Sequence, residues 1–126
     1  MTDIINIDTL KKTLADFAEI RDWKKYHSPK NLAMALTVEA SELLEIFQWM
    51  SEAESLAAKD AHEIKESISH ELADIIIYAI RMADLLDINL NEALLNKMLM
   101  NNDKYPADKV KGSARKYTHY AADTEA

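Results

Sequence analysis

Hydrophobic residues recur at every third or fourth position through most of this chain, which is the spacing of helices that each bury one face. The pattern predicts an all-α protein with four main helices and no strand. A polar connector is expected at residues 51–60, with room for a short helical piece. The four predicted helices cover about residues 8–26, 29–50, 60–86 and 89–104.

Short polar motifs give the expected helix starts, because side-chain oxygens there accept hydrogen bonds from free backbone N–H groups. A proline in the first helical position strengthens the second of these starts. The expected caps are Asp8 or Thr9, Ser28 before Pro29, Asp60 with Glu63, and Asn89 with Glu92.

Length and composition agree with this reading. The chain has 126 residues, with one glycine, two prolines and no cysteine. We expect a single domain over residues 1–126 with a four-helix-bundle-type fold, a helical core at about 8–105 and a basic tail at about 107–126. The first residues lack a leader pattern, and no apolar run approaches the ~20 residues needed to span a bilayer. A soluble cytoplasmic protein is therefore expected.

The third predicted helix is apolar around its whole circumference between Ile75 and Ile80. A helix of this kind is buried on all sides. We expect Ile76, Ile77 and Ile80 to pack against another subunit, which predicts a homo-oligomer, either a dimer or a tetramer built as a dimer of dimers. In the alternative, the N-terminal helix and the tail cover this face within one chain.

Two pairs of carboxylates interrupt the apolar rows. Glu39 with Glu42, and Glu71 with Asp74, each have i, i+3 spacing and share one helix face. The first acid of each pair falls in the middle of a row and the second at its edge. The rows are Leu32, Leu36, Leu43, Ile46 and Met50 in the second helix, and Ile64, Ile68, Ile75, Ala79, Met82 and Leu86 in the third.

Four carboxylates at one partly buried point repel each other strongly, so a cation is expected among them. Oxygen-only ligands favour Mg²⁺, with Mn²⁺ as a substitute. Glu45 extends the first pair and is a candidate outer-shell group. Alternatively, the i, i+3 spacing of these acids arises by chance, because the chain has 22 acidic residues and glutamate is a good helix former.

Cationic and aromatic side chains offer further binding groups. Lys97, Asn101 and Lys104 continue the inner row of the fourth helix, which suggests donors for an anion, or else lysines favoured near a helix C-terminus. Flat aromatic faces stack on nucleobases, although a small helical core is their more common place. The aromatic candidates are Trp23, Tyr26 and His27 near the first break, Trp49 at the end of the second helix, and Tyr78.

The net charge of −7 disfavours a surface that grips polymeric DNA or RNA, because such binding rests on neutralising many phosphates. A small phosphorylated ligand held through metal ions is still compatible with this charge. No polymeric nucleic acid and no membrane are expected as partners.

Together these residues resemble the all-α NTP pyrophosphohydrolases of the MazG-like superfamily, in particular the dCTP pyrophosphatase subgroup. The resemblance runs from about residue 10 to 120, and the acidic signature has a gap of 28 residues between its two pairs. Longer members carry a second such domain, which this sequence lacks, so a role related to guanosine tetraphosphate is not expected. The flanking blocks are Phe17-Ala18-Glu19-x-Arg21-Asp22-Trp23, His27-x-Pro29-Lys30-Asn31-Leu32, Glu45-x-Phe47-Gln48-Trp49, Lys97-Met98, Tyr105-Pro106 and Ser113-x-Arg115-Lys116-Tyr117.

The resemblance implies a reaction in which a deoxynucleoside triphosphate and water give a monophosphate and pyrophosphate, in nucleotide-pool house-cleaning. It implies Mg²⁺ held by the four acids of the signature, and leaves the proton acceptor open among these and Glu45. It also implies a helical bundle assembled as dimers or tetramers. By position, Trp23, His27, Trp49 and Tyr78 would surround the base and sugar, Lys97 and Asn101 would contact phosphate or sugar, and Lys104, Tyr105, Arg115 and Lys116 are weaker candidates.

Three alternatives stay open to different degrees. A dUTP- or dUDP-directed all-α hydrolase carries similar acids. A non-catalytic nucleotide-binding helical interaction module would be favoured by a lost acid, yet Glu39, Glu42, Glu71 and Asp74 are all intact. A di-iron or di-manganese bundle of ferritin type needs Glu-x-x-His motifs, and this chain has none.

Overall fold

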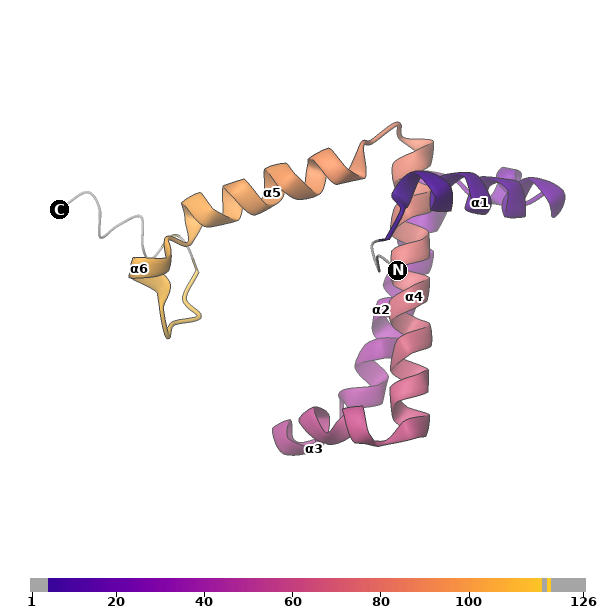
Figure 1. Cartoon of the computed structure of the whole chain (residues 1–126). Helices are drawn as coiled ribbons and strands as arrows, with labels where there is room; N and C mark the ends of the chain where they lie inside the picture. The colour runs from indigo at the N-terminus through magenta and orange to yellow at the C-terminus, as the bar shows by residue number, and fades with distance from the viewer. Residues whose placement is uncertain (1–4, 117, 119–126) are drawn as a thin grey trace. The chain divides into compact units, whose positions relative to one another are not determined.

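The computed structural model describes residues 5–116 and 118, and the regular secondary structure of this part of the chain is all helical, without a strand (Figure 1). The chain forms two compact units, Met1–Ile88 and Asn89–Ala126. The all-α prediction is confirmed, whereas the single-domain organisation stays a prediction. The elements are α1 Ile7–Ile20, η1 Lys24–Tyr26, α2 Pro29–Phe47, α3 Glu52–Ala57, η2 Ala58–Asp60, α4 His62–Leu85, α5 Leu90–Lys104 and α6 Ala107–Val110.

The first unit is built on the antiparallel pair α2 and α4, which lie side by side along their length (Figure 1). α1 packs against α4. Leu32 of α2, Ile80 of α4 and Ala18 of α1 are buried at these contacts. The predicted row of α2 points inward, because Leu32 is buried and its other four members are only partly exposed. In the α4 row, Leu86 is the exception, at 48% exposed.

Helices α1 and α4 are each followed by an aspartate with left-handed backbone geometry. After α1, Asp22 has φ 55°, and the Trp23 N–H donates to the Ala18 carbonyl at 2.9 Å. After α4, Asp87 has φ 53°, and the Ile88 N–H donates to the Ala83 carbonyl at 2.9 Å. These are Schellman motifs with aspartate in the position that glycine usually takes.

The first Schellman motif shows that the predicted length of the first helix was wrong. α1 ends at Ile20 and not near Tyr26, because the left-handed turn at Asp22 stops the helix before η1 begins. Its N-cap is Asn6, whose side chain accepts from the Thr9 N–H, in place of the expected Asp8 or Thr9.

The other caps are partly as predicted. Ser28 caps α2 with Pro29 in the first turn, and Asn89 caps α5, so both predictions are confirmed. Asp60 does not cap α4, because η2 takes up Asp60 and the N-cap is Ala61, which makes no side-chain hydrogen bond. Helix α2 ends at Phe47, two to three residues earlier than expected.

The apolar segment of α4 divides between the core and the surface. Ile80 is 2% exposed, so it packs inside its own chain, and its predicted place in a subunit interface was wrong. The inward side of α4 meets α1 and α2, which account for its burial. Ile76 and Ile77 are 42% and 36% exposed and are available to a partner. The predicted homo-oligomer therefore stays a prediction that rests on fewer residues.

The second unit contains α5 and α6. Lys97, Asn101 and Lys104 follow each other at steps of four and three along α5, and the Tyr105 N–H closes the helix on the Asn101 carbonyl at 2.9 Å. Gly112 then takes φ 79°, which a residue with a side chain rarely adopts. Tyr117 and the last eight residues of the predicted tail lie outside the described residues. Among the described residues, no helix is long and apolar enough to cross a membrane.

Candidate functional site

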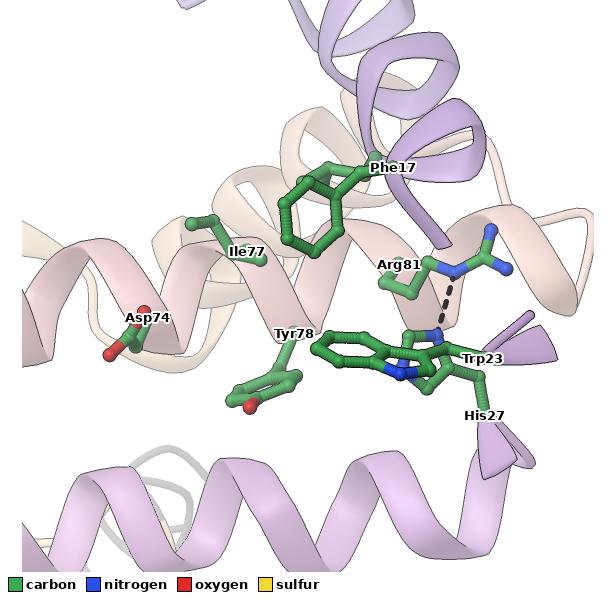
Figure 2. A pocket seen from close by; sticks show the side chains of 8 residues that line it. Phe17, Trp23, His27, Asp74, Ile77, Tyr78 and Arg81 are labelled. Atoms are coloured by element: carbon green, nitrogen blue, oxygen red, sulfur yellow. Dashed lines mark hydrogen bonds between the residues drawn. The ribbon is translucent and has the colours of Figure 1, made fainter. Parts of the chain in front are cut away.

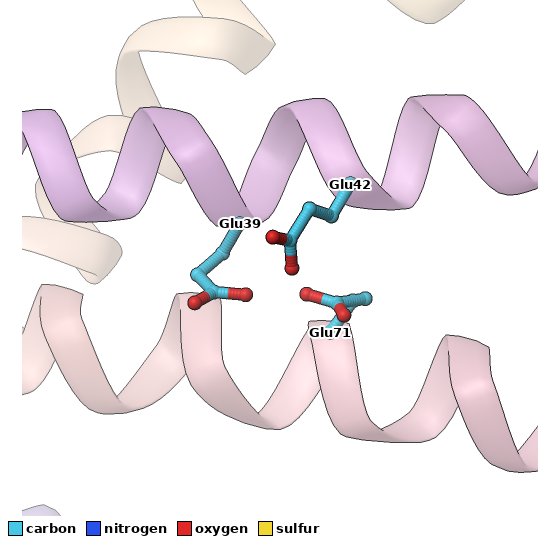
Figure 3. A group of neighbouring side chains, drawn as sticks. All are labelled: Glu39, Glu42 and Glu71. Atoms are coloured by element: carbon cyan, nitrogen blue, oxygen red, sulfur yellow. The ribbon is translucent and has the colours of Figure 1, made fainter.

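Three carboxylates meet between α2 and α4. Glu39 and Glu42 project from α2, and Glu71 projects from α4 into the same gap (Figure 3). One oxygen from each of the three side chains lies within 4.8 Å of the other two. The i, i+3 spacing puts the two α2 acids on one face, and the antiparallel pairing brings Glu71 opposite them. We call these three residues the acid group.

Two members of the acid group, Glu39 and Glu42, have raised pKa values. The pKa of Glu39 is raised, chiefly because protonated Glu39 donates a hydrogen bond to Glu71, and further by burial and by the negative charges of Glu71 and Asp74. The pKa of Glu42 is raised chiefly by its hydrogen bond and charge interaction with Glu39. Without a cation, Glu39 and Glu42 therefore retain their protons above the usual pH range for carboxylates.

Glu71 Oε2 carries the clearest sign of a missing partner. It is a buried side-chain atom that has no hydrogen-bond partner among the residues the structure describes. A buried carboxylate oxygen without a donor or cation is costly. A donor set of oxygens only, crowded around one point, fits a hard divalent cation such as Mg²⁺ or Mn²⁺.

The other two predicted acids, Asp74 and Glu45, lie near the acid group but are not part of it. Asp74 lies outside the set of three and lines a neighbouring cavity, although its charge contributes to the raised pKa of Glu39. Glu45 is exposed, and its charge contributes to the raised pKa of Glu42. Their roles as metal ligand and outer-shell group stay predictions.

A cavity of about 410 Å³ opens beside the acid group. This volume is within the range of small-ligand sites. Three predicted site residues, Trp23, His27 and Tyr78, line it together with Asp74, so the structure brings these four together (Figure 2). The full lining is Leu14, Phe17, Trp23, His27, Asp74, Ile77, Tyr78 and Arg81.

Four ring side chains, Phe17, Trp23, His27 and Tyr78, line the cavity, and we call them the aromatic wall. α1 ends at Ile20, and the left-handed turn at Asp22 directs the chain so that the Trp23 ring meets Phe17 edge-on, with ring centroids 5.7 Å apart. The centroids of Trp23 and His27 are 6.3 Å apart. On α4, burial raises the pKa of the Tyr78 hydroxyl, and the charges of Glu39 and Asp74 add to this. Tyr78 therefore stays a neutral hydrogen-bonding group at neutral pH.

Arg81 is a cavity residue that the sequence pattern did not single out. It is 4% exposed, and its Nε donates to His27 Nδ1 at 3.3 Å. Its Nη1 forms an ion pair with Asp84 Oδ2 at 3.3 Å. The pKa of His27 is lowered, first by burial and then by the Arg81 charge. The available signal was an arginine seven residues after Asp74, on the same face of one helix.

Trp49 does not line this cavity in one chain, and its predicted place around the same base as Trp23 and His27 stays a prediction. His27 precedes α2 and Trp49 follows it, and a helix of 19 residues is about 28 Å long. Trp49 is 89% exposed at the far end. It remains a candidate only for a site shared between copies of the chain.

The remaining predicted contacts belong to the second unit. Their roles in contacting phosphate or sugar stay predictions. They are Lys97, Asn101 and Lys104 on α5, Tyr105 at its C-cap, and Arg115 and Lys116 after α6.

Comparison with known proteins supports the earlier resemblance. Residues 34–119 match the MazG-like family, a segment that contains the acid group and Asp74. The chain is 37% identical over 112 residues to dCTP pyrophosphatase 1 of Rattus norvegicus and 36% identical over 112 residues to dCTP pyrophosphatase 1 of Homo sapiens. These matches cover 89% of the chain, which spans about two thirds (66%) of the length of these curated relatives.

A crystal structure of a pyrophosphatase from Archaeoglobus fulgidus DSM 4304 has a similar fold. The two structures superpose with a TM-score of 0.73 at 38% sequence identity. The match covers 84% of this chain and 97% of the archaeal one.

Proposed function

Because the chain belongs to the MazG-like family, we propose that it hydrolyses deoxynucleoside triphosphates to the monophosphate and pyrophosphate, using a divalent cation held by Glu39, Glu42 and Glu71. The observation that carries this proposal is the buried oxygen of Glu71, which lacks a partner among the described residues and lies in a group of three acids beside an aromatic cavity. The similarity to proteins named dCTP pyrophosphatase 1 and to a solved pyrophosphatase supports it.

The spacing along α4 suits a nucleotide. Glu71 and Arg81 are ten residues apart, which corresponds to about 15 Å along the helix axis. A triphosphate chain at the acid group would therefore place its base in the neighbouring cavity, near Trp23, His27 and Tyr78. Stacking on such aromatic faces contributes about 1–3 kcal/mol per base.

The proposed reaction follows from these placements. The acid group holds the cation, which when bound neutralises phosphate charge and lowers the pKa of water. The aromatic wall fixes the base and thereby the position of the α-phosphorus. Water attacks that phosphorus, the bond to the oxygen bridging the α- and β-phosphates breaks, and pyrophosphate leaves. The proton from water passes to a carboxylate, for which Asp74 and Glu45 are the candidates beside the acid group.

The preferred substrate that we propose is dCTP or a modified dNTP of similar shape. The names of the curated relatives support this choice over dUTP or dUDP. We also propose a homo-oligomer, because Trp49 and Ile76 leave apolar surface exposed in one chain. Light scattering of the purified protein would show the expected mass of a dimer or tetramer, and a monomer would contradict it.

The direct test is pyrophosphate release from a panel of the common NTPs and dNTPs, including dCTP, 5-methyl-dCTP and dUTP. We expect release with Mg²⁺, none with EDTA, and the monophosphate as co-product. Glu39→Gln should abolish release, whereas Glu66→Gln, which neutralises an exposed acid on α4, should leave it intact. Full activity of Glu39→Gln would contradict the proposed site, and no release from any nucleotide would contradict the proposed reaction.

A further inference from the structure

Arg81 is an unusual residue for the wall of an apolar cavity. It is almost fully buried, and a buried guanidinium is costly unless its N–H groups find partners. Two partners are present, His27 Nδ1 and Asp84 Oδ2, each at 3.3 Å (Figure 2 shows the first). Asp84 lies one turn further along α4, whereas His27 lies 54 residues away, between η1 and α2.

The contact with His27 fixes the direction of the hydrogen bond. Arginine has five N–H donors and no acceptor, and it stays protonated in proteins. Arg81 Nε must therefore donate, and His27 Nδ1 must accept through its lone pair. A neutral imidazole that accepts at Nδ1 carries its proton at Nε2.

We propose that Arg81 is a positioning residue that holds His27 in the cavity wall as the Nε2–H form, so that His27 presents a hydrogen-bond donor to the bound ligand. The arginine does this without touching the ligand itself. The hydrogen bond between Arg81 and His27 also connects the corner before α2 to α4, and it fixes the imidazole ring beside Trp23.

The surroundings of His27 are consistent with a neutral ring. Burial is the larger cause of its lowered pKa, and the Arg81 charge is the second. Trp23 meets the imidazole edge-on and contributes no charge. The ion pair with Asp84 does not compete for His27, because it uses Nη1 and leaves Nε directed at Nδ1.

This arrangement predicts the chemical character of the ligand group at that position, a step that rests on the proposed function. A donor at Nε2 requires an acceptor, such as a ring carbonyl or an unprotonated ring nitrogen of a nucleobase. The 2-carbonyl of a pyrimidine has this character. A base that presents an N–H donor there would leave two donors facing each other and bind weakly.

The first measurement is ¹⁵N NMR of the imidazole nitrogens in the whole protein without nucleotide. We expect a lone pair at His27 Nδ1 and the proton at Nε2. Arg81→Met should let the Nδ1–H form appear and should raise the pKa of His27. A wild-type spectrum with the proton at Nδ1 would overturn the proposal without any variant. The methionine side chain is unbranched and apolar, so we expect the fold to survive.

The second measurement is a double-mutant cycle on nucleotide hydrolysis with Arg81→Met and His27→Phe. Arg81→Met should raise KM about tenfold and change kcat little, because one hydrogen bond to the ligand is lost. In the His27→Phe background, Arg81→Met should have no further effect, since Arg81 acts through His27. Equal effects in both backgrounds would show direct action of Arg81 and overturn the proposal.

Asp84→Asn is the matched control, because it removes the ion pair of Arg81 but leaves the bond to His27. Its KM should stay within about twofold of the wild type, and a tenfold rise would assign the effect to the ion pair. The two proposals fail separately. Absence of pyrophosphate release would reject the proposed function, whereas the NMR result decides the role of Arg81 without turnover.

Discussion

Two clusters of charged side chains lie along α2 and α4 and differ in how their charge is balanced. The acid group, Glu39, Glu42 and Glu71, has three carboxylates and a buried oxygen without a partner among the described residues. The second cluster is centred on Arg81 in the cavity lining, which contacts both His27 and Asp84. We propose that a cation from outside the protein balances the first cluster, whereas residues of the chain itself balance the second.

This difference separates a group that binds from a group that positions. Hydrogen bonds among the acids, and then their negative charges, raise the pKa values of Glu39 and Glu42, and protons or a cation relieve the repulsion. The charge of Arg81 is balanced by Asp84, and we propose that Arg81 orients His27 without binding a ligand itself. Four predictions test this contrast.

The largest expected effect is that of Glu71→Gln. It removes one negative charge from the acid group, so turnover should fall by at least about 100-fold, because a direct ligand matters more than an outer-shell partner. The metal-free protein should become more stable, because repulsion within the group is relieved. Pyrophosphate release and thermal unfolding in EDTA measure the two effects.

Glu66→Gln on the exposed side of α4 is the control for charge removal alone. If Glu71→Gln kept normal turnover and the wild-type gain in Tm with Mg²⁺, the acid group would not be the metal site.

The next effect concerns the aromatic wall. Trp23→Ala removes the stacking surface of the cavity and should weaken nucleotide binding by about 1–3 kcal/mol, with little loss of kcat at saturation. Trp49→Ala at the far end of α2 is the comparison. If both substitutions weaken binding equally, the site is shared between copies of the chain, and titration calorimetry with a non-hydrolysable nucleotide would show this.

A smaller effect is the pH dependence of metal stabilisation. Glu39 and Glu42 have raised pKa values in the metal-free folded protein, so the folded state holds protons more tightly than the unfolded chain. Metal-free stability should therefore fall as the pH rises through these raised values. Mg²⁺ needs the deprotonated form, so its stabilising effect should grow over the same range.

Thermal unfolding with Mg²⁺ and with EDTA across this pH range measures the difference. With Mg²⁺ at about 100 times its Kd, the gain in Tm should be about 10 °C at neutral pH and should become smaller at acidic pH. A gain that is independent of pH would place the ion away from these carboxylates.

The smallest expected effect is on the stability of the fold, through the turn at Asp87 after α4. Asp87 has left-handed backbone geometry after α4, which is costly for residues other than glycine. Asp87→Gly should raise the free energy of unfolding by up to about 1 kcal/mol and leave both clusters unchanged. Denaturant unfolding measures the gain, with Asp87→Ala as a control that should destabilise.

The sequence predicted the helix faces well, because periodicity depends only on local spacing. The row through Leu32 and the position of Glu39 opposite Glu71 both follow from it. The caps at Ser28 and Asn89 were predicted for the same reason, since each bonds to a residue three positions later. The resemblance to the MazG-like family is confirmed by the match over residues 34–119.

The errors have tertiary or conformational causes. The end of α1 was missed because Asp22 takes a backbone geometry that sequence patterns associate with glycine. Arg81 was missed because its partner His27 is distant in sequence. Trp49 was grouped with Trp23 as an aromatic residue near a helix end, whereas the length of α2 separates the two within one chain. Asp60 resembled a cap, but η2 uses it.

The two tryptophans give the protein a built-in optical reporter. Trp23 lies in the cavity wall against Phe17 and His27, whereas Trp49 is almost fully exposed at the other end of α2. With only two tryptophans in the chain, Trp49→Phe leaves emission from the cavity alone. Nucleotide entry, the charge state of His27 and the loss of Arg81 should then each change the colour or yield of a single fluorophore.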